Sequence, residues 1–173
     1  FRHGPMVMVD GLQEYLKLPA TFNPRTLQLA NDMRRDPRYA GASSQTMIDA
    51  VMERLRTGGY TYTLEPGVFG THSADEFWFD RKVGFCEHIA SSFVLLMRAM
   101  GIPARVVTGY QGGSVNPVDG FWTVRQSDAH AWAEVWIAAR GWVRVDPTSA
   151  VAPSRIGSLA RLDAPRNVLT QAL

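Results

Sequence analysis

The stretch VGFCEHIASSFVLLMRAMGIPARVVTG, residues 83–109, combines a helical apolar pattern with the single cysteine of the chain, Cys86. Gly101 ends the pattern. The apolar residues recur at the three- and four-residue spacing of one helix face: Ile89, Ala90, Phe93, Leu96, Met97 and Met100. A helix that is apolar over so much of its circumference is typical of the centre of a fold. We therefore predict a central helix that starts beside Cys86.

The amino-terminal third of the chain carries two further helical patterns. The first begins at Pro24, with Asn23 as its expected N-cap, and ends before Pro37. The second covers residues 45–57, with Ser44 as its expected N-cap and a glycine pair as its stop. The apolar residues of the second helix, Ile48, Val51, Met52 and Leu55, form one stripe that we expect to be buried.

Strand patterns follow the central helix. Alternating or β-branched segments predict strands at residues 60–63, 103–110, 121–125, 129–137 and 141–146. Residues 65–82 and 111–120 are predicted to be loops, and the segment 103–110 to be a buried strand. Helices first, then one central helix and a run of antiparallel strands, indicate an α+β fold. We predict one domain over residues 1–173, with a helical part at 1–59, a core at about 60–150 and a tail at 150–173.

Composition narrows the class of protein. The 173 residues include 46% hydrophobic and 20% charged side chains, with a formal net charge of +2. The basic residues are scattered, so no nucleic-acid surface is expected. One cysteine forms no internal disulfide, which leaves the redox compartment open. The longest purely apolar run, residues 93–97, is far short of a membrane span. Because the sequence starts at Phe1, we expect it to be a piece of a longer protein.

The position of Cys86 favours reactivity. A helix N-terminus presents unpaired backbone N–H groups and the positive end of the helix dipole, and both stabilise a thiolate. The alternative is that Cys86 is a small core residue, which is the commonest role of a free cysteine.

His130 and Asp146 belong to two strands that are joined by a short turn. Alternation puts His130 on the face opposite the small residues Ala131 and Ala133, and it puts Asp146 on the face opposite Val145. A two-residue turn would send the two polar side chains to opposite faces. We therefore predict a three-residue connection or a bulge near Gly141, which places His130 and Asp146 on the same face.

A thiolate at a helix start, an imidazole and a carboxylate on neighbouring strands form the Cys–His–Asp arrangement of acyl transfer. Each residue also has a structural alternative: His130 as a hydrogen-bonded strand residue, and Asp146 as a turn residue before Pro147. Zinc is the rival chemistry for Cys86, His88, His130 and Asp146. However, Cys86 and His88 point to different sides of the helix, so no metal and no cofactor are expected. His88 and His72 are predicted to be a first-turn polar residue and a surface residue.

Three motifs, GFCEHIASSFVLLMRAMGIPARVVTGY, DAHAWAEVWI and GWVRVDPT, resemble the core motifs of the transglutaminase-like family within the papain-like superfamily. Residues 60–150 resemble its bacterial membrane-anchored branch, of the TgpA type. The resemblance implies a papain-like transglutaminase core in which Cys86 is the nucleophile, His130 the general base and acid, and Asp146 the orienting carboxylate. The segment ADEFWFDRKVGFCEHIA departs from the family, in which aliphatic and small residues are expected before the glycine. We expect this departure to alter the shape of the substrate cleft and not the three site residues.

The same resemblance implies a reaction. We expect amide acyl transfer through a thioester on Cys86, of the protein-glutamine gamma-glutamyltransferase type, in the cell envelope. The substrate would be a protein or peptide amide, with a cell-wall peptide as one alternative, and the acceptor an amine or water. A cysteine amidase, peptidase or deamidase of the same fold is the second hypothesis, and an inactive binding domain is the third. The parent protein would be membrane-anchored, with this domain in the periplasm.

Three further residues are weaker candidates for the site. Trp78 and Trp132 carry indole N–H groups that could stabilise an oxyanion, and Glu134 lies on the predicted face of His130. The alternatives are that the two tryptophans are core or cleft-wall residues and that Glu134 is an exposed strand residue.

Overall fold

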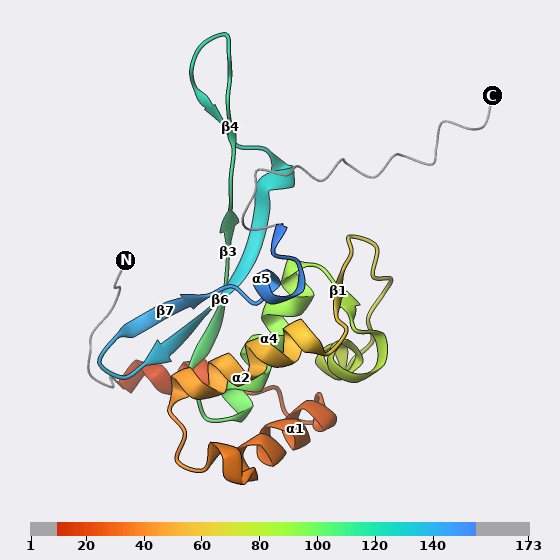
Figure 1. The fold of residues 1–173 in the computed structure, drawn as a ribbon, viewed down its shortest axis with the longest axis vertical. Coiled ribbons are helices and arrows are strands. Elements are labelled where there is room, and N and C mark those ends of the chain that lie inside the picture. The colour runs from red at the N-terminus through yellow and green to blue at the C-terminus, as the bar shows by residue number, and fades with distance from the viewer. Residues whose placement is uncertain (1–9, 155–173) are drawn as a thin grey trace, which may run out of the picture.

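The computed structural model describes residues 10–154 (Figure 1). It confirms the predicted order of helices, a central helix and antiparallel strands. The helical elements are η1 (Asp10–Leu16), α1 (Pro24–Arg35), η2 (Pro37–Tyr39), α2 (Ser44–Thr57), α3 (Ser73–Asp75), η3 (Glu76–Arg81), α4 (Cys86–Ala99), η4 (Gln126–Asp128) and α5 (Thr148–Val151). The strands are β1 (Thr61–Tyr62), β2 (Val83–Gly84), β3 (Ala104–Tyr110), β4 (Ser114–Val115), β5 (Trp122–Thr123), β6 (Ala129–Ile137) and β7 (Gly141–Val145).

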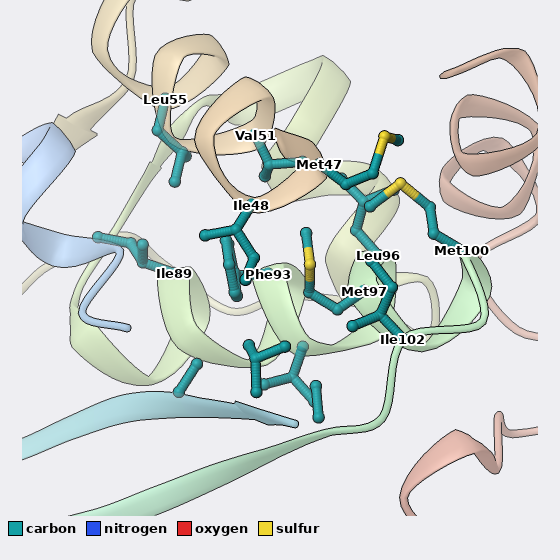
Figure 2. Packing of buried hydrophobic residues seen from close by; sticks show 14 of the residues in the cluster. Met47, Ile48, Val51, Leu55, Ile89, Phe93, Leu96, Met97, Met100 and Ile102 are labelled. Carbon is teal, nitrogen blue, oxygen red and sulfur yellow. The ribbon is translucent and has the colours of Figure 1, made fainter. Parts of the chain in front are cut away.

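The predicted central helix is α4, and it packs between α2 and the sheet (Figure 2). Small and β-branched residues of β6 (Ala133, Val135) meet Phe93 of α4, and all three side chains are fully buried. Ile48 and Val51 of α2 belong to the same cluster. Burial of a side chain as large as Phe93 contributes roughly 1.5 to 3 kcal/mol. The position of α4, and therefore of its first residue Cys86, is fixed by this core.

The main sheet is antiparallel with the order β3-β6-β7. Residues 138–140 connect β6 to β7, and the register pairs Ile137 with Gly141. The predicted three-residue connection is confirmed. Even-numbered residues of β6 therefore lie opposite even-numbered residues of β7. Positive φ angles at Ala139 (63°), within the connection, and at Gly141 (78°), the first residue of β7, turn the chain here. The segment β3, predicted to be buried, is an edge strand whose outward residues are half-exposed or exposed.

The segment 65–82, predicted to be a loop, is helical in its second half. The helix α3 continues into η3, a π-helix that carries Phe77 and Trp78 to the fully buried core. Wide π-helical turns are rare and lack the 3.6-residue period, so the apolar pattern did not indicate a helix. The second predicted N-cap was wrong by one residue, because the hydroxyl of Ser43, not Ser44, accepts the N–H of Thr46.

A small hairpin replaces the predicted strand at 121–125 and part of the predicted loop at 111–120. Its strands β4 and β5 have two residues each and form a separate sheet that projects from the body of the protein (Figure 1). Its apolar residues remain largely exposed: Val115 is 51% exposed and Trp122 is 70% exposed. The hairpin rises from the ends of β3 and β6 that lie nearest His130.

The start of α1 is held by an exchange of side-chain caps with α3. Asn23 has a left-handed backbone (φ 53°), and its Oδ1 accepts the N–H of Ala74 at 3.0 Å. The carboxylate of Asp75 in turn accepts the N–H groups of Arg25 (3.0 Å) and Thr26 (2.7 Å) and the Thr26 hydroxyl (2.6 Å). Asn23 thus occupies the N-cap position of α1, as predicted, but its side chain accepts no N–H group of α1. The carboxylate of Asp75 takes that role. His72 is exposed, as predicted, and its Nδ1 accepts the N–H of Asn23.

Replacing Asp75 with alanine is expected to lower the free energy of unfolding by about 2 to 3 kcal/mol, because Asp75 is 3% exposed and two N–H groups of α1 lose their acceptor. Urea denaturation of the variant measures this loss. Asp32→Ala is the matched control, since Asp32 is exposed and accepts one side-chain bond from Gln28. Equal losses in the two variants would contradict the capping role of Asp75.

The predicted tail at 150–173 begins within α5, and residues 155–173 lie outside the described part of the chain. Between residues 10 and 154 no helix combines the length and the apolar character that crossing a bilayer requires.

Candidate active site

Cys86 is the first residue of α4, where the helix leaves its backbone N–H groups without intrahelical acceptors. The core described above places it beside β6, the central strand of the main sheet, and Cys86 is 7% exposed. It packs in a small cluster with Ala90 and Ala131, against which Tyr62 and Phe85 lie. The cysteine therefore sits at a helix start, as predicted, with the first residues of β6 beside it.

His130 and Asp146 meet across the sheet. His130 is the second residue of β6, and Asp146 follows the last residue of β7 directly. The atoms His130 Nε2 and Asp146 Oδ2 are 2.8 Å apart, and both side chains are largely buried. If the register is continued by one residue, Asp146 faces Trp132, so the bond to His130 runs diagonally. The shared face predicted from parity brings the two residues together.

The same imidazole also contacts the thiol. The interaction of Cys86 with His130 shifts the pKa of both groups, and because Nε2 faces Asp146, Nδ1 is the ring nitrogen available to the sulfur. Burial alone would raise the pKa of the Cys86 thiol. The hydrogen bond of His130, together with the backbone N–H groups of Ala131 and Glu87, outweighs burial and lowers that pKa.

The pKa of His130 shifts in the opposite direction to that of Cys86. The hydrogen bond to Asp146, followed by the one to Cys86, raises the pKa of His130 to about 9 against the opposing effect of burial. A lowered thiol pKa and a raised imidazole pKa favour a thiolate–imidazolium pair at neutral pH. This arrangement can deliver a nucleophile and a proton to the same reacting centre.

Trp132 forms one wall beside His130. Its ring is nearly parallel to the imidazole, with centroids 6.2 Å apart and 23° between the planes. The space for its ring depends on Gly109, because a Cβ at that position would lie 2.9 Å from the indole. The Trp132 Nε1 atom is buried and has no hydrogen-bond partner within residues 10–154. Trp132 is thus a wall of the site with an unused donor.

The other two weaker candidates lie away from the site. Trp78 is fully buried, and its Nε1 donates to the carbonyl of Ser92 at 3.3 Å, so its N–H is not available to a substrate. Glu134 forms an ion pair with Arg105, with 2.6 Å between Nη2 and Oε2. Four residues along a strand separate Glu134 from His130 by about 13 Å. The structure therefore corrects both assignments, since Trp78 is a core residue and Glu134 belongs to a partly buried ion pair.

His88 lies on the first turn of α4, as predicted, and is enclosed between the rings of Phe69 and Phe85, with centroids 4.3 and 4.4 Å away. Burial lowers the pKa of His88, which favours its neutral form. No group of three or more histidine, cysteine, aspartate or glutamate side chains between residues 10 and 154 is arranged to hold a metal ion.

The structure adds two neighbours of the site that sequence reasoning missed. Tyr62 reaches the Cys86 cluster because β1 pairs in parallel with β2 and sets Tyr62 opposite Gly84. Arg144 contacts Asp146 from the same face of β7. The alternation of β7 places Arg144 on that face, but no local pattern pairs two strands as short as β1 and β2.

Comparison with known proteins gives consistent matches. The family model described as transglutaminase-like superfamily matches residues 28–147. A protein-glutamine gamma-glutamyltransferase of Pseudomonas aeruginosa is 45% identical over 141 residues, which cover 82% of this chain and 20% of that protein.

Two solved structures extend the comparison. The periplasmic domain of TgpA from Pseudomonas aeruginosa, bound to ethylmercury, aligns with a TM-score of 0.78 and 42% identity over 85% of this chain and 51% of that one. A candidate cysteine protease from Cytophaga hutchinsonii aligns with a TM-score of 0.55 and 25% identity over 87% of this chain and 46% of that one. The chain thus spans about half of these solved chains and a fifth of the curated relative.

Proposed function

This chain belongs to the transglutaminase-like superfamily, and from that premise we propose that Cys86, His130 and Asp146 are a catalytic triad for acyl transfer from carboxamides. The observation that carries the proposal is the pair of contacts on one imidazole. Asp146 lies 2.8 Å from one ring nitrogen, and the Cys86 thiol at the start of α4 interacts with the same imidazole. Both contacts favour the charged pair that a cysteine acyltransferase uses.

The reaction follows from these positions. The Cys86 thiolate attacks the carboxamide carbon, and the electron pair of the C=O bond moves to oxygen. When the tetrahedral intermediate collapses, the C–N bond breaks and the His130 imidazolium gives its proton to the departing nitrogen, which leaves as ammonia or an amine. Neutral His130 then takes a proton from an incoming amine or water, which attacks the thioester. Loss of the thiolate restores the thiolate–imidazolium pair.

Asp146 and the start of α4 stabilise the two charged groups of the reaction, the imidazolium and the oxyanion. Asp146 holds the imidazole in orientation and stabilises its cationic form, as the carboxylate of a triad does. The backbone N–H of Cys86, in the first turn of α4, is the donor we assign to the oxyanion. A well-placed donor of this kind lowers the barrier by roughly 3 kcal/mol.

We propose an amine as the preferred acceptor, which makes the activity a protein-glutamine gamma-glutamyltransferase, as the curated relative is named. Hydrolysis or deamidation by the same triad is the second candidate, and the protease-like neighbour supports it. An inactive binding domain is the third, and the complete set of three residues speaks against it. By its likeness to the TgpA domain, we place this chain in the periplasm, as part of a membrane-anchored protein of the cell envelope.

The test supplies a glutamine-containing peptide together with a fluorescent primary amine and records both ammonia release and amine incorporation. We expect equal rates of the two when the amine is in excess. Ammonia release without incorporation would assign the chain to the deamidases. Absence of both products, with the native fold verified by circular dichroism, would favour the binding domain and contradict the proposal.

A further inference from the structure

Arg144 contacts the site from the solvent side of β7. Its Nη2 lies 2.9 Å from Oε1 of Gln111 and 3.3 Å from Oδ2 of Asp146. Its guanidinium carbon lies 4.2 Å from the centroid of the Trp132 ring, within the range of a cation–π contact. One arginine therefore touches the carboxylate beside His130 and also the ring that stacks on His130.

The two donors share one oxygen of Asp146. His130 Nε2 and Arg144 Nη2 both face Oδ2, at 2.8 and 3.3 Å. The other oxygen, Oδ1, is buried and has no hydrogen-bond partner among residues 10–154. Within residues 10–154, the carboxylate is therefore held through Oδ2 alone, by His130 and Arg144. A change at Arg144 therefore acts on the oxygen that His130 uses.

The arginine is itself held in place. Gln111, the first residue after β3, accepts from Arg144 and donates its backbone N–H to the carbonyl of Asp128 at 2.8 Å. The Trp132 ring also packs against the guanidinium group. Planar stacking and a forked set of donors are properties of arginine that lysine lacks.

We propose that Arg144 is a positioning residue of this site, which shares Oδ2 of Asp146 with His130 and thereby limits the stabilisation of the imidazolium. The catalytic part of this inference rests on the proposed function, but the effect on His130 can be measured without any substrate.

The charges around His130 determine in which direction its pKa moves when Arg144 is replaced. Asp146, after β7, and Cys86, on α4, are the titratable groups that bear on His130, and Arg144 is the cation at the shared oxygen. Removing that cation leaves Oδ2 to His130 alone and takes away a like charge near the imidazolium. Arg144→Gln should therefore move the pKa of His130 upward, and Arg144→Lys should keep it close to that of the unmodified protein.

The experiment titrates the histidine ring signals by NMR in the unmodified protein, Arg144→Gln, Arg144→Lys and Arg140→Gln, with His130→Gln used to assign the signal. Arg140 is a matched control, because it is exposed, precedes the same strand and also bonds a glutamine, Gln45. We expect an upward shift in Arg144→Gln alone. Initial rates of acyl transfer should fall about fivefold in kcat, with KM little changed.

Three outcomes would overturn the inference: an unchanged His130 pKa in Arg144→Gln, a downward shift, or an equal shift in Arg140→Gln. A purely structural Arg144 would lower stability without moving the titration. If the expected shift occurs in a protein that transfers no acyl group, the positioning role stands while the proposed function fails. If acyl transfer occurs and the titration does not respond, only the positioning role fails.

Discussion

Replacing Cys86 with serine is expected to reduce acyl transfer by at least about 10⁴-fold. The thiol is the nucleophile of the proposed reaction, and its pKa is lowered by the hydrogen bond of His130 and two backbone N–H groups despite burial. A serine hydroxyl at the same place remains protonated at neutral pH and attacks a carboxamide poorly. Amine incorporation into a glutamine peptide, followed under initial-rate conditions, measures the loss.

Serine is nearly isosteric with cysteine, so the fold should survive this change. The side chain lies in a small cluster with Ala90 and Ala131, apart from the large core around Phe93. Thermal unfolding of the variant checks that the first turn of α4 is intact. Retention of more than about 1% of the rate by a well-folded variant would exclude Cys86 as the nucleophile.

Replacing His130 with glutamine is expected to lower the rate by a similar factor, about 10⁴-fold, because triad members act as a unit. The imidazole holds the proton that the leaving nitrogen needs, and Asp146 raises its pKa to about 9. Glutamine fills a similar volume and offers hydrogen bonds, but it neither gives nor takes a proton near neutral pH. The same peptide assay measures the effect.

The matched control for this variant is His72→Gln. His72 is exposed, and its ring accepts one backbone N–H, that of Asn23. A loss of activity in His72→Gln as large as that in His130→Gln would mean that the assay responds to folding and not to the proton carrier.

The predicted positions of the three residues of the proposed triad depended on patterns that are local in sequence. The apolar period of residues 89–100 placed Cys86 at the start of a buried helix, and the alternation of β6 and β7 placed His130 and Asp146 on one face. The parity of the short connection then required three residues, which the structure has at 138–140. These features depend on near neighbours, so a single sequence contains them.

Contacts between distant segments were not predictable in the same way. Trp78 was a candidate because it carries an N–H, but its burial depends on a π-helix that packs against α4. Glu134 shares the face of His130, yet Arg105 on the neighbouring strand β3 neutralises it. Tyr62 reaches Cys86 through the parallel pairing of two strands of two residues each. In each case the partner is set by tertiary packing, which overrides local propensity.

The charged pair also sets a pH window for the reaction. The thiolate–imidazolium form exists above the lowered pKa of Cys86 and below the raised pKa of His130, about 9. Activity should therefore rise as pH passes the thiol pKa and fall as pH passes about 9, where the imidazolium loses the proton that the leaving group needs.

Alkylation of Cys86 by iodoacetamide across the range from about pH 5 to pH 10, in the unmodified protein and in His130→Gln, tests the central claim most directly. The chain has one cysteine, so the mass shift reports this thiol alone. We predict rapid reaction well below the roughly 8.5 of a free thiol, and in His130→Gln a shift of that reaction to higher pH. Identical profiles for the two proteins, or a thiol that stays inert in the folded state, would contradict an activated Cys86–His130 pair.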